Sequence, residues 1–451
     1  MKEASVVVVG GSAAGPVAAI TVRRHYKDTS VLLIRKEKQV MVPCGIPYIF
    51  GTVGAPDKNV IPDALLTNNG VELMIDEVTS VDRASKTLTT AGGEVVGYDK
   101  LILATGSVPV RPPIPGMDLP NVFPVWKDSD FLGQTQRVLA NAKDIVIIGG
   151  GFIGAEMADE CKKMGDASVT IVELLPHCLL LAMDEEFCCM AEEKLAENGV
   201  KIITDNGVRS ISGDGNVSGV ELQNGDKLKA DAVIVGIGAA PNTELARDME
   251  LEIGEARGIR VDEYMRTSDK DIFAVGDCAD KFSFFTKKPS GLRLASIATV
   301  EARIAGANVF ELRRKNIGAV GVFATAFGDF ALAAAGLTER AAKDAGFEVV
   351  VGQAAAVDKH PGSMPNAKEV KAKLIFQKET GNLLGGELSG GATTAEMANI
   401  IAALIQGKAT ADDVALFQMG TQPCLTASPI AYQIVNAAEQ AAMKLRQASA
   451  G

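Results

Sequence analysis

One strand–turn–helix pattern occurs twice in this chain, and the repeat limits the folds that the sequence can adopt. The first copy has a strand at 6–9, the glycine-rich turn GGSAAG at 10–15 and a helical stretch at 16–25. In the second copy, a strand at 145–148 leads into the turn GGGFIG at 149–154. Both strands are continuously apolar, which is typical of parallel strands buried on both faces of a sheet. The repeat predicts an α/β protein with two nucleotide-binding units.

The second turn matches the dinucleotide-binding fingerprint GxGxxG in full. Gly149 permits a sharp turn, Gly151 lets a pyrophosphate approach the backbone, and Gly154 lets helix and strand pack closely. The helix that follows would present free N–H groups and its positive dipole end to the phosphates. Glu173 ends the next strand, where a carboxylate accepts hydrogen bonds from ribose hydroxyls. Residues 174–177 contain no arginine for a 2′-phosphate, so the sequence favours NAD(H) over NADP(H).

The first turn departs from this fingerprint. Gly10 and Gly15 occupy the outer positions, but Ser12 stands where the middle glycine is expected. The acid at the end of the second strand is also missing, because that strand runs into Arg35, followed by a lysine and Glu37. Two interpretations are open: Glu37 holds the ribose, or the adenosine end of the nucleotide meets a cation.

The composition excludes several classes of protein. With 47% hydrophobic and 22% charged residues, the chain is not disordered. A net charge of −11 without a basic run offers little to phosphate backbones or anionic lipids, so we expect no nucleic-acid and no membrane partner. The uncharged stretch at 4–20 is short for a membrane span and is broken by glycines and Pro16. We interpret it as a buried strand that enters a turn, and we expect a cytoplasmic protein.

The seven cysteines do not form a disulfide framework or a zinc motif. They include no CxxC pair, and the three histidines are scattered, so we expect a reducing compartment and no structural metal site. Cys188 and Cys189 fall in a helical stretch, where adjacent side chains diverge, and we interpret them as packing residues. Cys278 is interpreted in the same way.

Cys44 differs from the other cysteines because it lies in VPCGIPY, directly after the first nucleotide-binding unit. At the start of a helix, free N–H groups and the dipole would lower the pKa of the thiol and favour the nucleophilic thiolate. The alternative is a buried structural cysteine, the usual state of a free cysteine. The local sequence leaves both interpretations open.

The sequence changes in character from about residue 320. Strands are expected at 347–351 and 370–376, and Ala-rich amphipathic helices at 396–405 and 432–445. No glycine-rich phosphate turn occurs there. We therefore expect an α+β third domain that forms an interface rather than a ligand site.

Six motifs in this order carry a resemblance to a known family: GGSAAG, PCGIPY, LILATGSVP, GGGFIG followed by VE, IGAAPNTEL and IFAVGDCAD. Together they resemble the FAD-dependent pyridine nucleotide–disulfide oxidoreductase family. PCGIPY resembles its single-cysteine branch, which includes coenzyme A disulfide reductases, NADH-dependent persulfide reductases and NADH oxidases. The resemblance implies two Rossmann-like domains plus a C-terminal α+β dimerisation domain. The implied boundaries are 1–112 and 246–320 for a discontinuous FAD-binding domain, 113–245 for an NAD-binding domain, and 321–451 for the dimerisation domain.

The resemblance also implies the site residues. Those for FAD are Gly10, Gly11, Ser12, Ala13, Ala14, Gly15, Arg35, Lys36, Glu37, Pro43, Val78, Ala104, Thr105, Gly106, Gly276, Asp277, Ala295 and Ala298. Those for NADH, on the opposite face of the flavin, are Gly149, Gly151, Phe152, Ile153, Gly154, Glu173 and Gly238. Cys44 is the implied catalytic residue.

The implied reaction is the reduction of a small disulfide, persulfide or polysulfide by NADH, through FAD and Cys44. Two alternatives are open. The chain is an NADH oxidase that reduces oxygen or peroxide through a sulfenic acid on Cys44, or it is an electron-transfer flavoprotein subunit that passes electrons to a protein partner. The sequence leaves the identity of the acceptor open.

The C-terminal region departs from the family pattern at its acid–base positions. Two-cysteine members use the histidine of a His-Pro pair from the partner subunit of the homodimer, whereas this chain has Gln422 there. The tyrosines of coenzyme A disulfide reductases are also absent, at 421–423 and 363–365, which weakens coenzyme A disulfide as the substrate. If the C-terminal segment reaches the other subunit's flavin, Cys424 is a resolving thiol or an interface cysteine without chemistry. His360 is expected to shape a loop.

Overall fold

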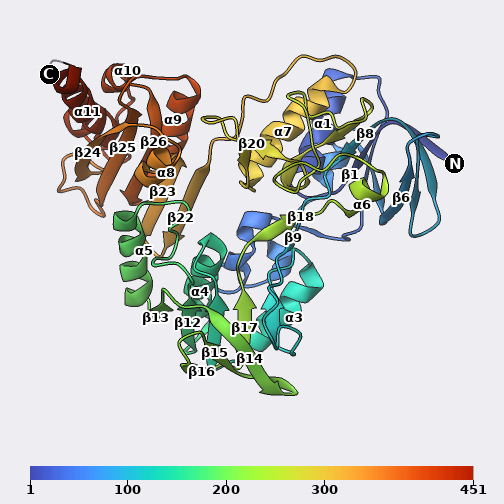
Figure 1. The fold of residues 1–451 in the computed structure, drawn as a ribbon, viewed down its shortest axis with the longest axis horizontal. Coiled ribbons are helices and arrows are strands. Elements are labelled where there is room, and N and C mark those ends of the chain that lie inside the picture. The colour runs from blue at the N-terminus through green and yellow to red at the C-terminus, as the bar shows by residue number, and fades with distance from the viewer. Residues whose placement is uncertain (450–451) are drawn as a thin grey trace.

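A computed structural model describes residues 1–449, which form three sheet-based units around a common centre (Figure 1). In the N-terminal unit, the four valines of the first strand are almost fully buried, in a sheet whose five central strands are parallel. Their order is β5 (Glu72–Ile75), β2 (Val31–Arg35), β1 (Lys2–Val9), β8 (Val95–Leu103) and β19 (Ile272–Ala274). The chain therefore leaves this sheet after β8 and returns to it with β19.

Two helices cover one face of the N-terminal sheet. Helix α1 (Ala14–His25) follows the first glycine turn, and helix α7 (Ala295–Asn308) packs beside it (Figure 1). Both helices are rich in small residues on their buried sides, which lets them approach closely. The Cβ that Gly306 lacks would lie 2.7 Å from the carbonyl oxygen of Ala18.

The second copy of the repeat forms the middle unit. Its sheet is fully parallel, in the order β10 (Val122–Pro124), β17 (Ala232–Val235), β11 (Asp144–Ile148), β12 (Ser168–Val172) and β13 (Val200–Ile203). Helices α4 (Phe152–Met164), α3 (Ser129–Leu139) and α5 (Glu185–Glu197) pack in the core of this unit. A three-stranded antiparallel sheet, β14 (Val208–Asp214), β15 (Asn216–Leu222) and β16 (Lys227–Lys229), packs on the other side.

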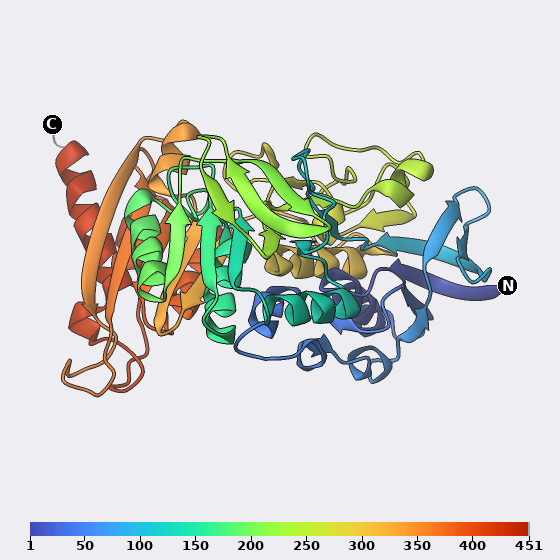
Figure 2. The same ribbon diagram turned by 90° about the horizontal axis from the view of Figure 1, so that it is seen from below.

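The C-terminal unit is antiparallel, as expected for its sequence. Its strands lie in the order β22 (Val322–Phe327), β23 (Phe330–Gly336), β26 (Leu383–Gly390), β25 (Glu369–Gln377) and β24 (Val349–Val357). Helices α9 (Thr394–Gln406) and α11 (Gln433–Ser449) pack on this sheet, and α11 lies at the opposite end of the molecule from β1 (Figure 2). The α/β class with two Rossmann-type sheets and an α+β third unit is confirmed. The domain boundaries remain predictions.

Within residues 1–449, no helix has the length and apolarity needed to cross a membrane.

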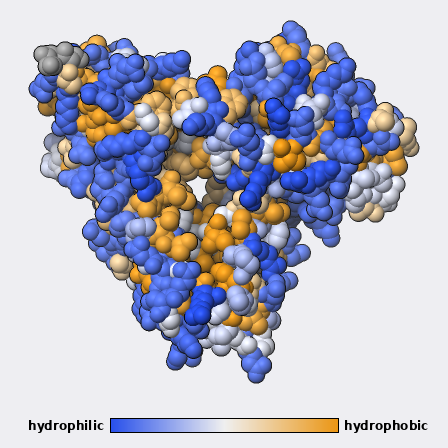
Figure 3. Space-filling view, in the orientation of Figure 1, coloured by the Kyte–Doolittle hydropathy of each residue, from blue (hydrophilic) through white to orange (hydrophobic). Residues whose placement is uncertain are grey.

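A buried ionic network joins the C-terminal unit to the middle unit. The Nζ of Lys373 on β25 lies 2.9 Å from Asp184 and 3.1 Å from Glu339. The Asp184 N–H donates to Glu387 Oε1 at 2.6 Å, while the other oxygen of Glu387 has no partner. Both Lys373 and Asp184 are buried, so each has lost its hydration and depends on the other for its charge. Near the centre of the molecule, a hollow lies in the face that Figure 3 shows, between the three units.

We expect Glu387→Gln to stabilise the protein at pH 9. Burial and the adjacent Asp184 raise the pKa of Glu387 to about 9. The folded chain therefore keeps a proton that the unfolded chain loses near its ordinary pKa of about 4.3, so unfolding becomes easier as pH rises through this window. Glutamine resembles the protonated acid and removes that dependence. The measurement is the free energy of unfolding in urea at pH 6 and pH 9. A pH dependence equal to that of the unmodified protein would contradict the assignment, and Glu348→Gln, at an exposed acid, is the control.

Candidate functional site

Both glycine turns have the backbone geometry of a dinucleotide cradle. Gly10 has φ +116°, and a Cβ on it would lie 2.1 Å from the carbonyl oxygen of Ala104. A Cβ on Gly15 would lie 1.8 Å from the carbonyl oxygen of Gly10, and one on Gly154 would lie 1.9 Å from that of Gly149. No side chain fits at these positions. The two turns are thus built alike, and the serine in the first turn does not change its conformation.

The phosphate-facing position of the second turn is open. No atom lies within 4 Å of the Cβ position of Gly151, at the N-terminus of α4. An approaching pyrophosphate would therefore meet backbone N–H groups without displacing protein atoms. Ile153 is exposed at this end of α4. The ring of Phe152 stacks on that of Phe323 from β22, with centroids 5.3 Å apart and planes at 7°.

The strands that follow the two turns end in opposite charges. Glu173 accepts hydrogen bonds from the N–H groups of Gly150 and Leu175. In the first unit, Arg35 takes the equivalent place, because its Cδ lies 2.4 Å from the Cβ position of Gly11. The Arg35 side chain is held by Asp63 at 2.6 Å and by the carbonyl oxygen of Glu37 at 2.8 Å. The Arg35 guanidinium is thus buried and paired with a carboxylate, and both interpretations of this end of the site remain predictions.

The residues predicted for FAD come from several segments that the fold brings together. A Cβ on Gly276 would lie 3.0 Å from the Cβ of Ala14 and 3.5 Å from that of Ala298, so the first turn, the loop after β19 and α7 converge. The Ser107 hydroxyl donates to Asp277 at 2.8 Å. Around this point lie Ser12 and Ala13 in the turn, Ala104, Thr105 and Gly106 after β8, and Ala295 at the start of α7. Lys36 and Val78 lie further out, where the N–H of Asp76 donates to the carbonyl oxygen of Arg35.

Cys44 lies in η1 (Pro43–Gly45), a 3₁₀ turn that is followed by a second one, η2 (Pro47–Ile49). It therefore does not lie at the start of an α-helix. The residue is exposed, which excludes the buried structural cysteine. Asn59 holds the segment by donating to the carbonyl oxygen of Val42 at 3.0 Å. The expectation of a helix start was wrong because two prolines four positions apart interrupt the α-helical hydrogen-bond pattern.

The expected effect on the Cys44 thiol was also wrong. Desolvation by the surrounding protein and the negative charge of Glu156 raise the pKa of Cys44, while Lys127 lowers it. A 3₁₀ turn of three residues offers no helix dipole of useful size. Lys127 also lies 3.7 Å from Asp277, so it stands between the cysteine segment and the loop after β19.

Three polar residues near Cys44 were not predicted from the sequence. Glu156 on α4 is buried and accepts a hydrogen bond from Thr325 of β22 at 2.9 Å. Tyr48, on η2, interacts with Glu156. Lys127 lies between β10 and α3. The sequence contained one signal for Glu156. This acidic residue follows the fingerprint by two positions, at a point where the helix must be buried against its sheet.

Gly238, which was predicted to bind NADH, follows β17 and has φ +102°. Its carbonyl oxygen accepts the N–H of Val110, next to the antiparallel pair β9 (Ser107–Pro109) and β18 (Ala239–Pro241). This pair joins the N-terminal and middle units. Gly238 is therefore placed between the two nucleotide cradles.

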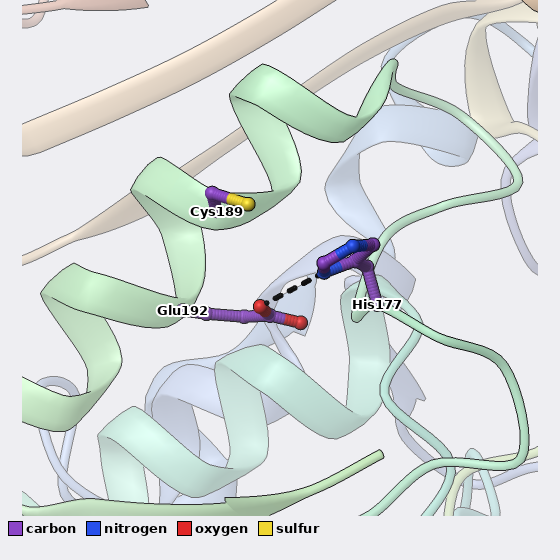
Figure 4. Close-up of side chains that lie close together, drawn as sticks. All are labelled: His177, Cys189 and Glu192. Carbon is purple, nitrogen blue, oxygen red and sulfur yellow. Dashed lines mark hydrogen bonds and ion pairs between the residues drawn. The ribbon is translucent and has the colours of Figure 1, made fainter. Parts of the chain in front are cut away.

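A His–Cys–Glu cluster joins His177, on the loop that follows β12, to Cys189 and Glu192 on α5 (Figure 4). Glu192 of α5 contacts His177 Nδ1 at 3.1 Å and accepts the N–H of Cys178 at 2.7 Å. The Cys189 sulfur lies within 4.8 Å of the ligating atoms of both. These side chains are of metal-ligand types, and the sequence analysis did not anticipate the cluster. The hydrogen bonds of Glu192 fix this loop to α5.

The segment at 420–428 packs against the loop that carries His360. The N–H of His360 donates to the carbonyl oxygen of Pro423 at 3.1 Å, and its Nδ1 lies 2.9 Å from that of Thr426. His360 therefore shapes a loop, as expected. Gln422 accepts the N–H of Cys424 at 2.7 Å, and Cys424 is exposed.

The two cradles and the cysteine segment between them define a class of dinucleotide-dependent redox proteins. Family models match residues 4–302 as a pyridine nucleotide-disulphide oxidoreductase and residues 322–430 as the dimerisation domain of that family. The chain belongs to the pyridine nucleotide-disulphide oxidoreductase family.

Three comparisons show the range of activities among similar proteins. The chain is 30% identical to an NADH oxidase of Methanocaldococcus jannaschii over 97% of this chain and 99% of that one. It is 31% identical to a CoA-dependent NAD(P)H sulfur oxidoreductase of Pyrococcus furiosus, over 91% of this chain and 94% of that one. The structure of an NAD-dependent persulfide reductase from A. fulgidus aligns with a TM-score of 0.91 at 30% identity, covering 98% of this chain and 84% of that one.

The residues present fit FAD, the cofactor of this family. Gly10 and Gly15 let the first turn pack closely on Ala104 and on itself, which sets the start of α1 against the sheet in the arrangement that presents helix N–H groups to a pyrophosphate. The buried carboxylate of Glu301 accepts the N–H of Gly276 at 2.8 Å and so shapes the loop that carries Asp277. One oxygen of Glu301 is buried without a partner, so this side of the cradle is built around polar groups.

We expect Lys127→Met to raise the pKa of the Cys44 thiol. Removing the cation also leaves the negative charge of the nearby Asp277 uncompensated by Lys127, and both changes disfavour the thiolate. The expected result is alkylation of Cys44 by iodoacetamide about threefold slower at pH 7, measured by mass spectrometry of the Cys44 peptide. Lys201→Met, at an exposed lysine on β13, should leave the rate unchanged. A rate equal to or above that of the unmodified holoenzyme would show that Lys127 does not act on this thiol.

Proposed function

We propose that this chain is an FAD-dependent NADH oxidoreductase that reduces a small disulfide, persulfide or polysulfide through Cys44. The observation that carries the proposal is an exposed cysteine on a segment that packs on α4, the helix of the second cradle. Both cradles therefore flank one reactive sulfur. The sulfur-reducing relatives support the same substrate class.

The two cradles divide the cofactors between them. FAD is held by Gly10–Gly15, with Arg35, Lys36 and Glu37 at the adenosine end and Thr105, Gly276 and Asp277 along its phosphate and ribityl arm. NADH is held by Gly149–Gly154, with Glu173 on the ribose and Gly238 at the nicotinamide. Bound flavin supplies the transfer of two electrons from nicotinamide to sulfur.

Cys44 performs the sulfur chemistry. Its thiolate attacks one sulfur of the substrate, forms a new S–S bond and displaces a thiolate or sulfide. The exposure of Cys44 gives the substrate access, and Lys127 favours the charged form of the nucleophile. A single cysteine requires that the mixed disulfide or persulfide with substrate is the species that is reduced.

A second candidate is an NADH oxidase in which Cys44 is oxidised to a sulfenic acid by peroxide. The similarity to the NADH oxidase of Methanocaldococcus jannaschii supports this second candidate. The two activities are separated by measuring NADH consumption with oxygen alone and with a disulfide or polysulfide under anaerobic conditions. We propose that the protein carries out this sulfur reduction in the cytoplasm.

The homodimer completes the site in this proposal. The segment at 420–428 reaches the flavin site of the other subunit, where Gln422 replaces an acid–base residue. Leu425 in this segment and Ile430 just after it are exposed, which supports an interface role, because large apolar side chains on a surface mark contact sites.

We expect Cys44→Ser to lose disulfide, persulfide and polysulfide reduction while NADH still bleaches the flavin absorbance. The serine hydroxyl is not ionised at neutral pH and cannot carry the exchange. The measurement is anaerobic flavin reduction together with thiol or sulfide release. Cys424→Ser, at the other exposed cysteine, is the matched variant and separates a resolving role from a packing role. Unchanged sulfur reduction in Cys44→Ser would refute the proposal.

We expect Glu173→Ala to raise the KM for NADH about tenfold, because the hydrogen bonds that the ribose hydroxyls donate to a charged carboxylate are lost. The KM for NADPH should stay constant or fall, since repulsion of the 2′-phosphate is removed. The measurement is the rate of anaerobic flavin reduction against nucleotide concentration, with Glu221→Ala as an acid remote from the cradle. Equal changes for both nucleotides would contradict the ribose assignment.

A further inference from the structure

The Cys44 segment is fixed to the nucleotide helix α4 by buried carboxylates. Glu160 accepts the N–H of Thr52 at 2.6 Å and its hydroxyl at 2.8 Å, and the Cβ that Gly51 lacks would lie 2.7 Å from Glu160. Glu156 lies one helical turn before Glu160, on the same face of α4. The face that holds the segment therefore also presents Glu156 toward it.

The surroundings of Glu156 disfavour its ionised form. It is buried, it accepts one hydrogen bond from Thr325, and its neighbour Glu160 repels a second negative charge. The nearest cation on α4, Lys163, is bound at 2.7 Å to Asp159 and at 2.6 Å to Glu160. Burial raises the pKa of Glu156 to about 7, so it holds a proton in much of the neutral range.

Tyr48 connects Glu156 with the reactive sulfur. It lies on η2, the 3₁₀ turn that follows the one with Cys44 and packs on α4, and it interacts electrostatically with both Cys44 and Glu156. Its hydroxyl interacts with Glu156, and burial together with the carboxylates on α4 raises the pKa of Tyr48. The other charged groups that act on Cys44 are Lys127 and Asp277. Tyr48 therefore stays protonated. It can donate its proton only if a neighbouring acid gives it another one.

We propose that Tyr48 and Glu156 form a proton relay that protonates the thiolate leaving from the substrate. This inference rests on the proposed function of Cys44. The Cys44 thiolate attacks R–S–S–R′, the substrate S–S bond breaks, a Cys44–S–S–R bond forms, and R′–S⁻ leaves with the electron pair. R′–S⁻ takes the Tyr48 proton, Tyr48 takes the Glu156 proton, and solvent returns a proton to Glu156. No oxidation or reduction occurs in this step.

The relay accounts for the residues that the C-terminal region lacks. Gln422 cannot exchange a proton near neutral pH, and its side-chain oxygen accepts the N–H of Cys424. An acid supplied by α4, within the same subunit, makes a donor from the partner unnecessary.

The test compares two disulfides with different leaving thiols. An alkyl disulfide, such as bis(hydroxyethyl) disulfide, releases a basic thiolate that needs a proton. The aromatic disulfide dithiobis(nitrobenzoate) releases a thiolate that is stable without one. We expect Glu156→Gln to lose about 100-fold in kcat/KM for the alkyl disulfide at pH 6.5, with little change for the aromatic one. Tyr48→Phe should show the same pattern, and only the unmodified enzyme should lose alkyl-disulfide activity as pH rises through about 7.

A second measurement, the rate of Cys44 alkylation, tests the same residue without enzyme turnover. Removing the negative charge of Glu156 should lower the pKa of Cys44, so alkylation of Cys44 in the oxidised holoenzyme becomes about threefold faster at pH 7. Glu160→Gln, which weakens the contact to Thr52, is the structural control and should slow both disulfides alike.

Two outcomes overturn the relay. If Glu156→Gln loses the same activity with both disulfides, Glu156 has a structural role and the relay is wrong. The proposed function would still stand in that case, provided that the unmodified enzyme reduces both disulfides. Full alkyl-disulfide activity in Glu156→Gln would exclude the relay outright. An unmodified enzyme that reduces neither disulfide, nor persulfide and polysulfide, would instead reject the proposed function.

Discussion

The contact between Glu160 and Thr52 is the interaction on which the geometry of the site depends. The Glu160 side chain is almost completely buried and accepts three hydrogen bonds, two from Thr52 and one from Lys163 at 2.6 Å. Leaving such a carboxylate without partners is costly, so the segment that carries Cys44 cannot move away from α4 without a large loss of free energy. The helix that forms one nucleotide cradle therefore also sets the position of the reactive sulfur.

Helix α4 combines several tasks along its length. Its first residues close the pyrophosphate turn, Phe152 stacks on Phe323, Glu156 meets Thr325, and Glu160 holds the cysteine segment. Phe323 and Thr325 both belong to β22, the first strand of the C-terminal unit. Any shift of that unit is therefore felt at the nucleotide cradle and at Cys44 together. A dimer contact that fixes the C-terminal unit would then also fix the site.

The predictions succeeded where short-range sequence determines the structure and failed where distant segments meet. Glycine positions follow from local backbone geometry, so both turns were recognised, even with Ser12 in place of glycine. The electrostatics of Cys44 were not, because Lys127 and Glu156 are far away in sequence and act only after folding. The same holds for the ion pair of Arg35, because its partner Asp63 lies 28 residues further along the chain and meets the guanidinium only after folding.

The surroundings of Cys44 at first oppose its role, since desolvation by the surrounding protein and the negative charge of Glu156 disfavour the thiolate. However, a thiolate of very low pKa is a weaker nucleophile, and exchange is fastest when the pKa of the attacking thiol is close to the ambient pH. Lys127 offsets part of the carboxylate effect, so the site does not depend on an extreme pKa in either direction. The negative charge of Glu156 is also conditional, because at neutral pH its carboxyl group is protonated for part of the time. The group that disfavours the thiolate when charged is thus a proton donor when neutral, and the chain needs one because Gln422 cannot serve.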